Sequence, residues 1–160
     1  MTIILAADHA GFELKEVIKT FLQSKDYQIL DAGAHEMVLG DDYPQYMVAA
    51  AMKVAEDLKG DTKAIIFGKS GQGEAMVANR FPGVRAVVWY GNPTTSTLVN
   101  SVGESIIELS RKHNDANVLS IGAGFVDADE AKEAIELWLT TPFSGEEKHQ
   151  RRISQIDNIE

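Results

Sequence analysis

The chain contains no cysteine, and this absence excludes disulfide bonds, thiolate metal sites and a thiol nucleophile. A reducing compartment, the cytoplasm, is the matching expectation. The N-terminus lacks the basic start of a signal peptide, and no apolar run approaches the roughly 20 residues of a membrane span. We therefore expect a soluble protein with no membrane partner.

Positive charge is also scarce, because 15 Lys and Arg residues face 24 Asp and Glu residues, for a formal net charge of −9. Nucleic-acid binding depends on a basic face, so the composition argues against a nucleic-acid partner. Any phosphate that the protein binds must be held by a local group of cations. The sequence has no internal repeat or linker, and its 160 residues are expected to form one domain, 1–160.

Short apolar runs alternate with helical patterns along the chain. Strands are expected at 3–7, 27–30, 64–67, 86–89 and 118–121. Helices are expected at 14–22 behind Gly11, at 44–58, at 74–80, within 94–111, at 127–139 and, as a C-terminal helix, at about 145–159. This alternation predicts an α/β fold, a single-domain Rossmann-like α/β/α sandwich with a five-stranded parallel sheet. Ligands of such sheets bind at the carboxyl ends of the strands.

The turn after the third expected strand is the most informative local pattern. It reads Gly68-Lys69-Ser70-Gly71-Gln72-Gly73, and Glu74 follows it. Small residues let backbone N–H groups approach an anionic oxygen, and a carboxylate beside such an anion hole suits proton abstraction next to a carbonyl. Two plainer interpretations stay open: glycine-rich turns are common in α/β proteins, and Glu74 is also an ordinary residue for the first turn of a helix.

Six motifs occur in the order and approximate spacing of a known family. They are Asp8-His9-Ala10-Gly11, Asp42-Tyr43-Pro44, the turn from Gly68 to Glu74 with Ala78-Asn79 behind it, Pro82-Gly83-Val84-Arg85-Ala86, His113-Asn114-Asp115-Ala116-Asn117-Val118, and Lys148-His149-Gln150-Arg151-Arg152. Together they resemble the ribose-5-phosphate isomerase B family, which also includes galactose-6-phosphate isomerase subunits. The resemblance covers essentially the whole chain.

The resemblance implies an aldose–ketose isomerase that acts on a phosphorylated sugar through a cis-enediolate. It implies no metal and no organic cofactor, and a homodimer or tetramer whose pocket lies near a subunit interface. Many members of the family carry a cysteine base where this chain has Gly68. This chain resembles a second branch, with glycine at that position and the base at the position of Glu74. The expected reaction interconverts ribose 5-phosphate and ribulose 5-phosphate.

Further roles are implied residue by residue. The resemblance assigns ring opening to His113, ring opening or proton shuttling to Asp8, and contact with the sugar hydroxyls or the enediolate to Asn114. Substrate binding is expected of His9, Tyr43, Gly68, Ser70, Gly71, Gln72, Gly73, Lys148, His149 and Arg152, of which the last three and His9 lie near the phosphate. Each has a plainer alternative: Asp8 caps the helix after Gly11, His113 is a surface residue at a helix C-terminus, and the basic cluster is a solvated face.

Three departures from the family limit what can be carried over. Lys69 stands where glycine is usual, Gly124 stands where a substrate-binding arginine is common, and the segment 90–109 is longer than in common members. Two other functions therefore stay open: isomerisation of a different sugar phosphate, six-carbon or deoxy, and silent binding of a sugar phosphate. The joint presence of Asp8, Glu74 and His113 argues against silent binding, because a binder has no need of a proton-transfer set.

Overall fold

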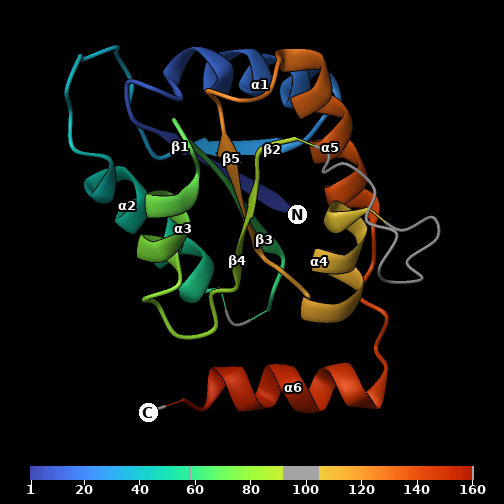
Figure 1. Cartoon of the computed structure of the whole chain (residues 1–160). Coiled ribbons are helices and arrows are strands. Elements are labelled where there is room, and N and C mark those ends of the chain that lie inside the picture. Colours follow the sequence, from blue (N-terminus) through green and yellow to red (C-terminus); the bar gives the residue numbers. More distant parts are fainter. Residues whose placement is uncertain (58, 92–104, 160) are drawn as a thin grey trace.

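The computed structural model describes residues 1–57, 59–91 and 105–159. Its elements, in chain order, are β1 (Thr2–Ala7), α1 (Phe12–Ser24), β2 (Gln28–Asp31), α2 (Tyr43–Ala55), β3 (Thr62–Gly68), α3 (Gln72–Ala78), β4 (Ala86–Trp89), α4 (Ile106–Asn114), β5 (Val118–Gly122), α5 (Ala128–Thr140) and α6 (Glu147–Asp157). All described strand pairs are parallel, in the order β2-β1-β3-β5-β4 (Figure 1). The predicted five-stranded parallel sheet is confirmed.

The sheet is covered on both faces, which explains why its strands are continuous apolar runs. Helices α2 and α3 pack together on one face, and α1, α4 and α5 pack on the other (Figure 1). Alternate residues of β1 enter different cores: Ile3 and Leu5 join the cluster that contains Trp138, whereas Ile4 and Ala6 join the cluster around Met47. The last helix, α6, lies apart from the sheet and contacts α4.

The boundaries of several elements differ from those predicted. The capping box expected at Asp127 and Glu130 is present, and α5 begins directly after it. A second capping box, formed by Ser105 and Glu108, opens α4, which the sequence pattern had not located. The rest of the helix expected within 94–111 falls largely on residues outside the described part of the chain. The C-terminal helix is shorter than the predicted 145–159.

Strand order places a crevice between β1 and β3. These strands are neighbours, and the chain continues from β1 to one side of the sheet and from β3 to the other. Parallel α/β sheets bind their ligands at such a switch point, beyond the carboxyl ends of the strands. Ala7 is paired with Phe67 across the two strands, so Asp8 and Gly68 leave the sheet side by side.

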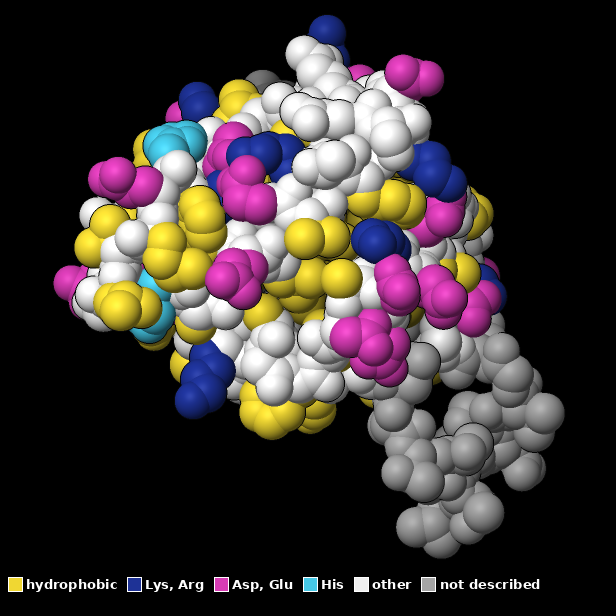
Figure 2. Space-filling view, turned by 90° about the horizontal axis from the view of Figure 1, so that it is seen from above, with side chains coloured by type: hydrophobic (Ala, Val, Ile, Leu, Met, Phe, Trp, Pro, Cys, Tyr) yellow, Lys and Arg dark blue, Asp and Glu magenta, His cyan; other side chains and the backbone are white. Residues whose placement is uncertain are grey.

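The surface agrees with the acidic composition. Seen from above in Figure 2, the Lys and Arg side chains of the described residues are scattered between acidic and hydrophobic groups and form no single basic patch on this face. Of the helices within the described ranges, none has the length and apolar character needed to span a membrane.

Candidate functional site

The Glu74 carboxylate lies directly in front of Gly68. A Cβ atom added to residue 68 would overlap with the Glu74 carboxylate group, so only glycine leaves room for it. Glu74 reaches this place from the first turn of α3, which begins two residues earlier than predicted. The glycine after β3 and the glutamate six residues later are therefore one structural unit.

Glu74 is almost fully buried, with 5% of its surface exposed. Within the described residues, its Oε2 atom is buried and has no hydrogen-bond partner. Burial raises the pKa of Glu74, the nearby charge of Asp8 raises it further, and a hydrogen bond from the residue's own backbone opposes the change. A carboxylate whose pKa is raised is a stronger base than an exposed one, which suits it to take up and return a proton.

The turn that precedes Glu74 contains backbone N–H groups that no acceptor among the described residues occupies. Gly71 has a left-handed backbone (φ 75°) that favours glycine, and its carbonyl oxygen accepts a 2.7 Å hydrogen bond from the Ser120 hydroxyl. The Ser70 hydroxyl oxygen accepts a hydrogen bond from the Gln72 N–H. In the described part of the chain, the N–H groups of Ser70 and Gly71 have no acceptor, so they are free to bind an anionic oxygen.

Tyr43 closes this turn from the side of α2. A Cβ atom on residue 73 would lie 2.6 Å from the Tyr43 hydroxyl oxygen, so Gly73 allows the phenol to pack against the backbone. The structure thus brings together Tyr43, Glu74 and the predicted turn residues Gly68, Ser70, Gly71, Gln72 and Gly73.

Asp8 and His9 border the same crevice from the end of β1. Asp8 is buried, and its Oδ1 atom accepts hydrogen bonds from the N–H groups of Ala10 and Gly11, at 3.0 and 3.2 Å. The alternative that Asp8 caps the helix is wrong, because the N-cap of α1 is Gly11 and no side chain caps it; Asp8 instead holds the turn before the helix. Its Oδ2 atom lies 3.8 Å from His9 Nδ1. A Cβ on Gly11 would clash with Phe67, so this glycine lets α1 start close to β3.

Asp41 is a residue of the site that sequence reasoning missed. Its Oδ1 atom accepts hydrogen bonds from the backbone N–H of His9 at 2.9 Å and from His9 Nδ1 at 2.6 Å. Although burial opposes the change, these hydrogen bonds hold the pKa of Asp41 below its usual value. The contact joins positions 32 residues apart, and the neighbouring motif Asp42-Tyr43-Pro44 gives no indication of it.

The other predicted residues lie at the opposite edge of the sheet. His113 and Asn114 end α4 just before β5, and the Ala64 N–H at the amino end of β3 donates to Asn117 O at 3.0 Å. The seven residues of β3 span roughly 20 Å between this edge and the Gly68 turn. Within one chain, His113 and Asn114 are therefore far from Glu74.

The basic cluster of α6 accompanies His113. The rings of His113 and His149 are stacked, with centroids 4.2 Å apart and an angle of 13° between their planes. His149 is 3% exposed, and burial, followed by the charge of His113, lowers its pKa. Lys148 forms a 2.8 Å ion pair with Glu146, whereas Arg152 is exposed and has no ion pair within the described ranges.

Two of the departures from the family are neighbours in space. The Gly124 N–H donates to the Lys69 carbonyl oxygen at 2.9 Å, and a Cβ on residue 124 would lie 3.3 Å from Lys69 Cγ. The exposed Lys69 thus stands beside the position where the family commonly has an arginine. Most of the longer segment 90–109 falls outside the described residues.

Comparison with known proteins agrees with these features. A family described as Ribose/Galactose Isomerase matches residues 3–156. The chain is 35% identical to a ribose-5-phosphate isomerase B of Mycolicibacterium paratuberculosis, over all of this chain and 92% of that protein. It is 34% identical to ribose-5-phosphate isomerase B of Escherichia coli, over 99% of this chain and 95% of the relative.

A solved structure is also similar over nearly the full length. It is the crystal structure of ribose-5-phosphate isomerase B from Mycoplasma genitalium with bound ribulose-5-phosphate, with a TM-score of 0.86 and 31% sequence identity. The alignment covers 98% of this chain and 93% of that structure.

Proposed function

The chain belongs to the ribose/galactose isomerase family and is a sugar-phosphate isomerase, and we propose that it interconverts ribose 5-phosphate and ribulose 5-phosphate. The observation that carries the proposal is the buried Glu74 carboxylate in front of Gly68, beside free backbone N–H groups. The names of the relatives, and the ribulose 5-phosphate bound to one of them, support this substrate. The lack of cysteine supports a cytoplasmic location.

Glu74 is the proposed base. Its carboxylate removes the proton from C2 of the open-chain aldose and returns it to C1, while the hydroxyl proton moves from O2 to O1. The intermediate is a cis-enediolate, whose negative oxygen the N–H groups of Ser70 and Gly71 stabilise. The raised pKa of Glu74 makes its carboxylate a stronger base, which helps it to remove the weakly acidic proton from C2.

The remaining roles require a second copy of the chain. His113 is the proposed ring-opening residue, and Arg152, with Lys148, the proposed phosphate ligand, yet these residues lie across the sheet from Glu74. We assign them to the pocket of a partner subunit, in a homodimer or a tetramer of such dimers. The role of His149 in this pocket is to hold the His113 ring by stacking, since the His149 ring is buried and lies against that of His113.

Mixing two inactive variants tests this shared pocket. In a heterodimer of Glu74→Gln and His113→Ala chains, one pocket carries both substitutions and the other carries none. Random assembly makes half of the dimers mixed, so roughly one quarter of wild-type turnover should return in the unseparated mixture, and roughly one half in the isolated mixed dimer. The two chains are co-expressed with different tags, the doubly tagged species is isolated, and ribose 5-phosphate turnover is measured.

The control is the same mixture of Glu74→Gln with Asp8→Asn, both of which lie in the same half of the pocket and should give no recovery. Absence of recovery with His113→Ala would place His113 outside a shared pocket. Because Lys69 and Gly124 depart from the family beside the pocket, the wild-type protein should also be assayed with six-carbon and deoxy sugar phosphates. Faster turnover of one of these compounds would make it the proposed substrate in place of ribose 5-phosphate. Absence of turnover with every sugar phosphate tested would favour a silent binding protein.

A further inference from the structure

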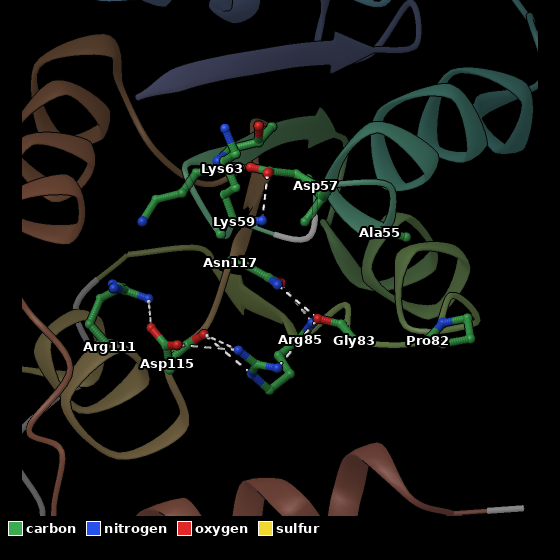
Figure 3. A pocket seen from close by; sticks show the side chains of 13 residues that line it. Ala55, Asp57, Lys59, Lys63, Pro82, Gly83, Arg85, Arg111, Asp115 and Asn117 are labelled. Carbon is green, nitrogen blue, oxygen red and sulfur yellow. Dashed lines mark hydrogen bonds and ion pairs between the residues drawn. The ribbon is translucent and has the colours of Figure 1, made fainter.

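A second cavity lies at the amino edge of the sheet, across the molecule from Glu74. Its volume is about 520 Å³, and it opens where β3, β4 and β5 begin, next to the end of α2 (Figure 3). Four of its lining side chains are cationic and two are anionic: Lys59, Lys63, Arg85, Arg111, Asp57 and Asp115. This excess of positive charge is notable in a protein whose formal net charge is −9.

Asp115 is already shared by both arginines. Its Oδ1 accepts a 2.7 Å bond from Arg111, and its Oδ2 accepts a 3.3 Å bond from Arg85 (Figure 3). Both guanidinium groups also donate to backbone carbonyl oxygens, Arg111 to Ala116 O and Arg85 to Asn114 O. Both arginines are therefore held by Asp115 and by backbone carbonyl groups, and each oxygen of Asp115 already accepts a hydrogen bond from an arginine.

Asp57 is likewise engaged, by backbone N–H groups and not by the two lysines. Its carboxylate oxygens accept hydrogen bonds from the backbone N–H groups of Lys59 and Thr62, at 3.0 and 2.6 Å. Among the residues that the structure describes, the ammonium groups of Lys59 and Lys63 make no hydrogen bond and no close ion pair. Burial, followed by the charge of Arg111, lowers the pKa of Lys63, and the charges of Asp115 and Asp61 oppose the change.

We propose that this cavity is a second binding site, separate from the substrate pocket, for a phosphorylated metabolite that carries at least two negative charges. Such a ligand would place its phosphate near Lys59 and Lys63, which make no close ion pair within the described residues. Val54, Ala55 and Pro82 provide an apolar wall for an organic body, and the volume lies within the range of small-molecule sites.

The site is connected to the proposed ring-opening residue. Arg85 Nε donates to Asn114 O at 3.0 Å, and Arg111 lies two residues before His113 in the last turn of α4. A ligand that attracts these guanidinium groups would therefore shift the end of α4, which carries His113 and Asn114. Binding itself goes beyond the proposed function, because it requires no turnover.

Calorimetric titration with pyrophosphate tests the site on the full-length protein. Lys59→Gln and Lys63→Gln should each weaken one class of pyrophosphate sites by about tenfold, since each removes a charged donor. Lys63→Arg, which keeps the charge, should bind within a few-fold of wild type. Lys132→Gln is the matched control, because Lys132 pairs with Asp129 on the exposed side of α5 and should leave binding unchanged.

Pyrophosphate affinities of Lys59→Gln and Lys63→Gln equal to those of wild type would overturn the proposal. Lys59 lies on an exposed loop, so Lys59→Gln carries the test if Lys63→Gln fails to fold. Succinate binding as tight as pyrophosphate binding would overturn the assignment to phosphate. The Glu74→Gln variant should keep this class of sites, so that loss of isomerase activity and loss of the second site are read separately.

Discussion

The two edges of the sheet differ in the kind of chemistry that they hold. The carboxyl edge has two buried carboxylates, Asp8 and Glu74. The Oε2 atom of Glu74 lacks a hydrogen-bond partner within the described residues. The amino edge, with α6, has a stacked pair of imidazole rings and an exposed Arg152 that forms no ion pair with the residues described. In the proposed function, one edge moves protons and the other holds the phosphate and opens the sugar ring. The proposal therefore needs both edges for one isomerase site.

The comparison also explains why the carboxyl edge is built tightly. Gly68, Gly73 and Gly11 each leave room for a neighbouring group that a side chain would displace. His113, by contrast, is partly exposed and stacks on the His149 ring, a contact that tolerates small shifts. Substitutions at the carboxyl edge should therefore reduce turnover more than substitutions at the amino edge do.

The largest effect is expected for Glu74→Gln. The amide keeps the shape of the side chain but cannot accept the proton, so turnover should fall by roughly 10²-fold or more, with a smaller change in KM. Steady-state kinetics with ribose 5-phosphate measure both parameters. Turnover close to wild type in a folded variant would move the base to another residue, with Asp8 the next candidate.

Gly68→Ala should act through Glu74. The added methyl group would overlap with the carboxylate and displace it, and a misplacement of this size reduces turnover by about tenfold to 10²-fold. Combining Gly68→Ala with Glu74→Gln gives the control: when the carboxylate is already inactive, the methyl group should cost little more. Additive losses would mean that Gly68 has a separate role.

Asp41→Ala should raise KM by about tenfold and change kcat less. The substitution removes both hydrogen bonds that orient His9, which the proposal places near the phosphate. Asp41→Asn keeps an oxygen acceptor for the same two donors and should recover much of the loss. Asp42→Asn is the neighbouring control. An equal fall in kcat for Asp41→Ala would link Asp41 to the chemical step instead.

The sheet and the turn could be predicted from the sequence because local residue patterns indicate both. Apolar runs of four to seven residues indicate strands, and small residues before Glu74 indicate the turn. The hydrogen bonds between His9 and Asp41 join distant positions with no shared motif, so no local pattern indicates them. The separation of His113 from Glu74 follows from strand direction, because α4 returns the chain to the amino edge before β5 begins.

A smaller effect concerns stability. The pKa of Glu74 is higher in the folded protein than its usual value, so the protonated form stabilises the fold at low pH and this contribution is lost as the pH rises through the folded pKa. Glu74→Gln stays neutral throughout. Its midpoint of thermal unfolding should exceed that of wild type at pH 8, on the order of 2–4 °C for each kcal/mol, and the difference should vanish near pH 4. Glu133→Gln, on an exposed carboxylate, should show no such trend.

The smallest effect, none at all, is expected on removal of metal ions. Asp8, His9 and Asp41 bring possible ligand atoms within 4.8 Å of one another, which makes this cluster the place to look for an ion in the described part of the chain. However, Asp8 Oδ1 accepts two backbone N–H groups, and Asp41 Oδ1 accepts two donors from His9. These hydrogen bonds engage both Oδ1 atoms and His9 Nδ1, so few ligand atoms of the cluster are left for a cation. Turnover should thus survive dialysis against a strong chelator, and a loss that one added divalent ion restores would make the carboxyl edge a metal site.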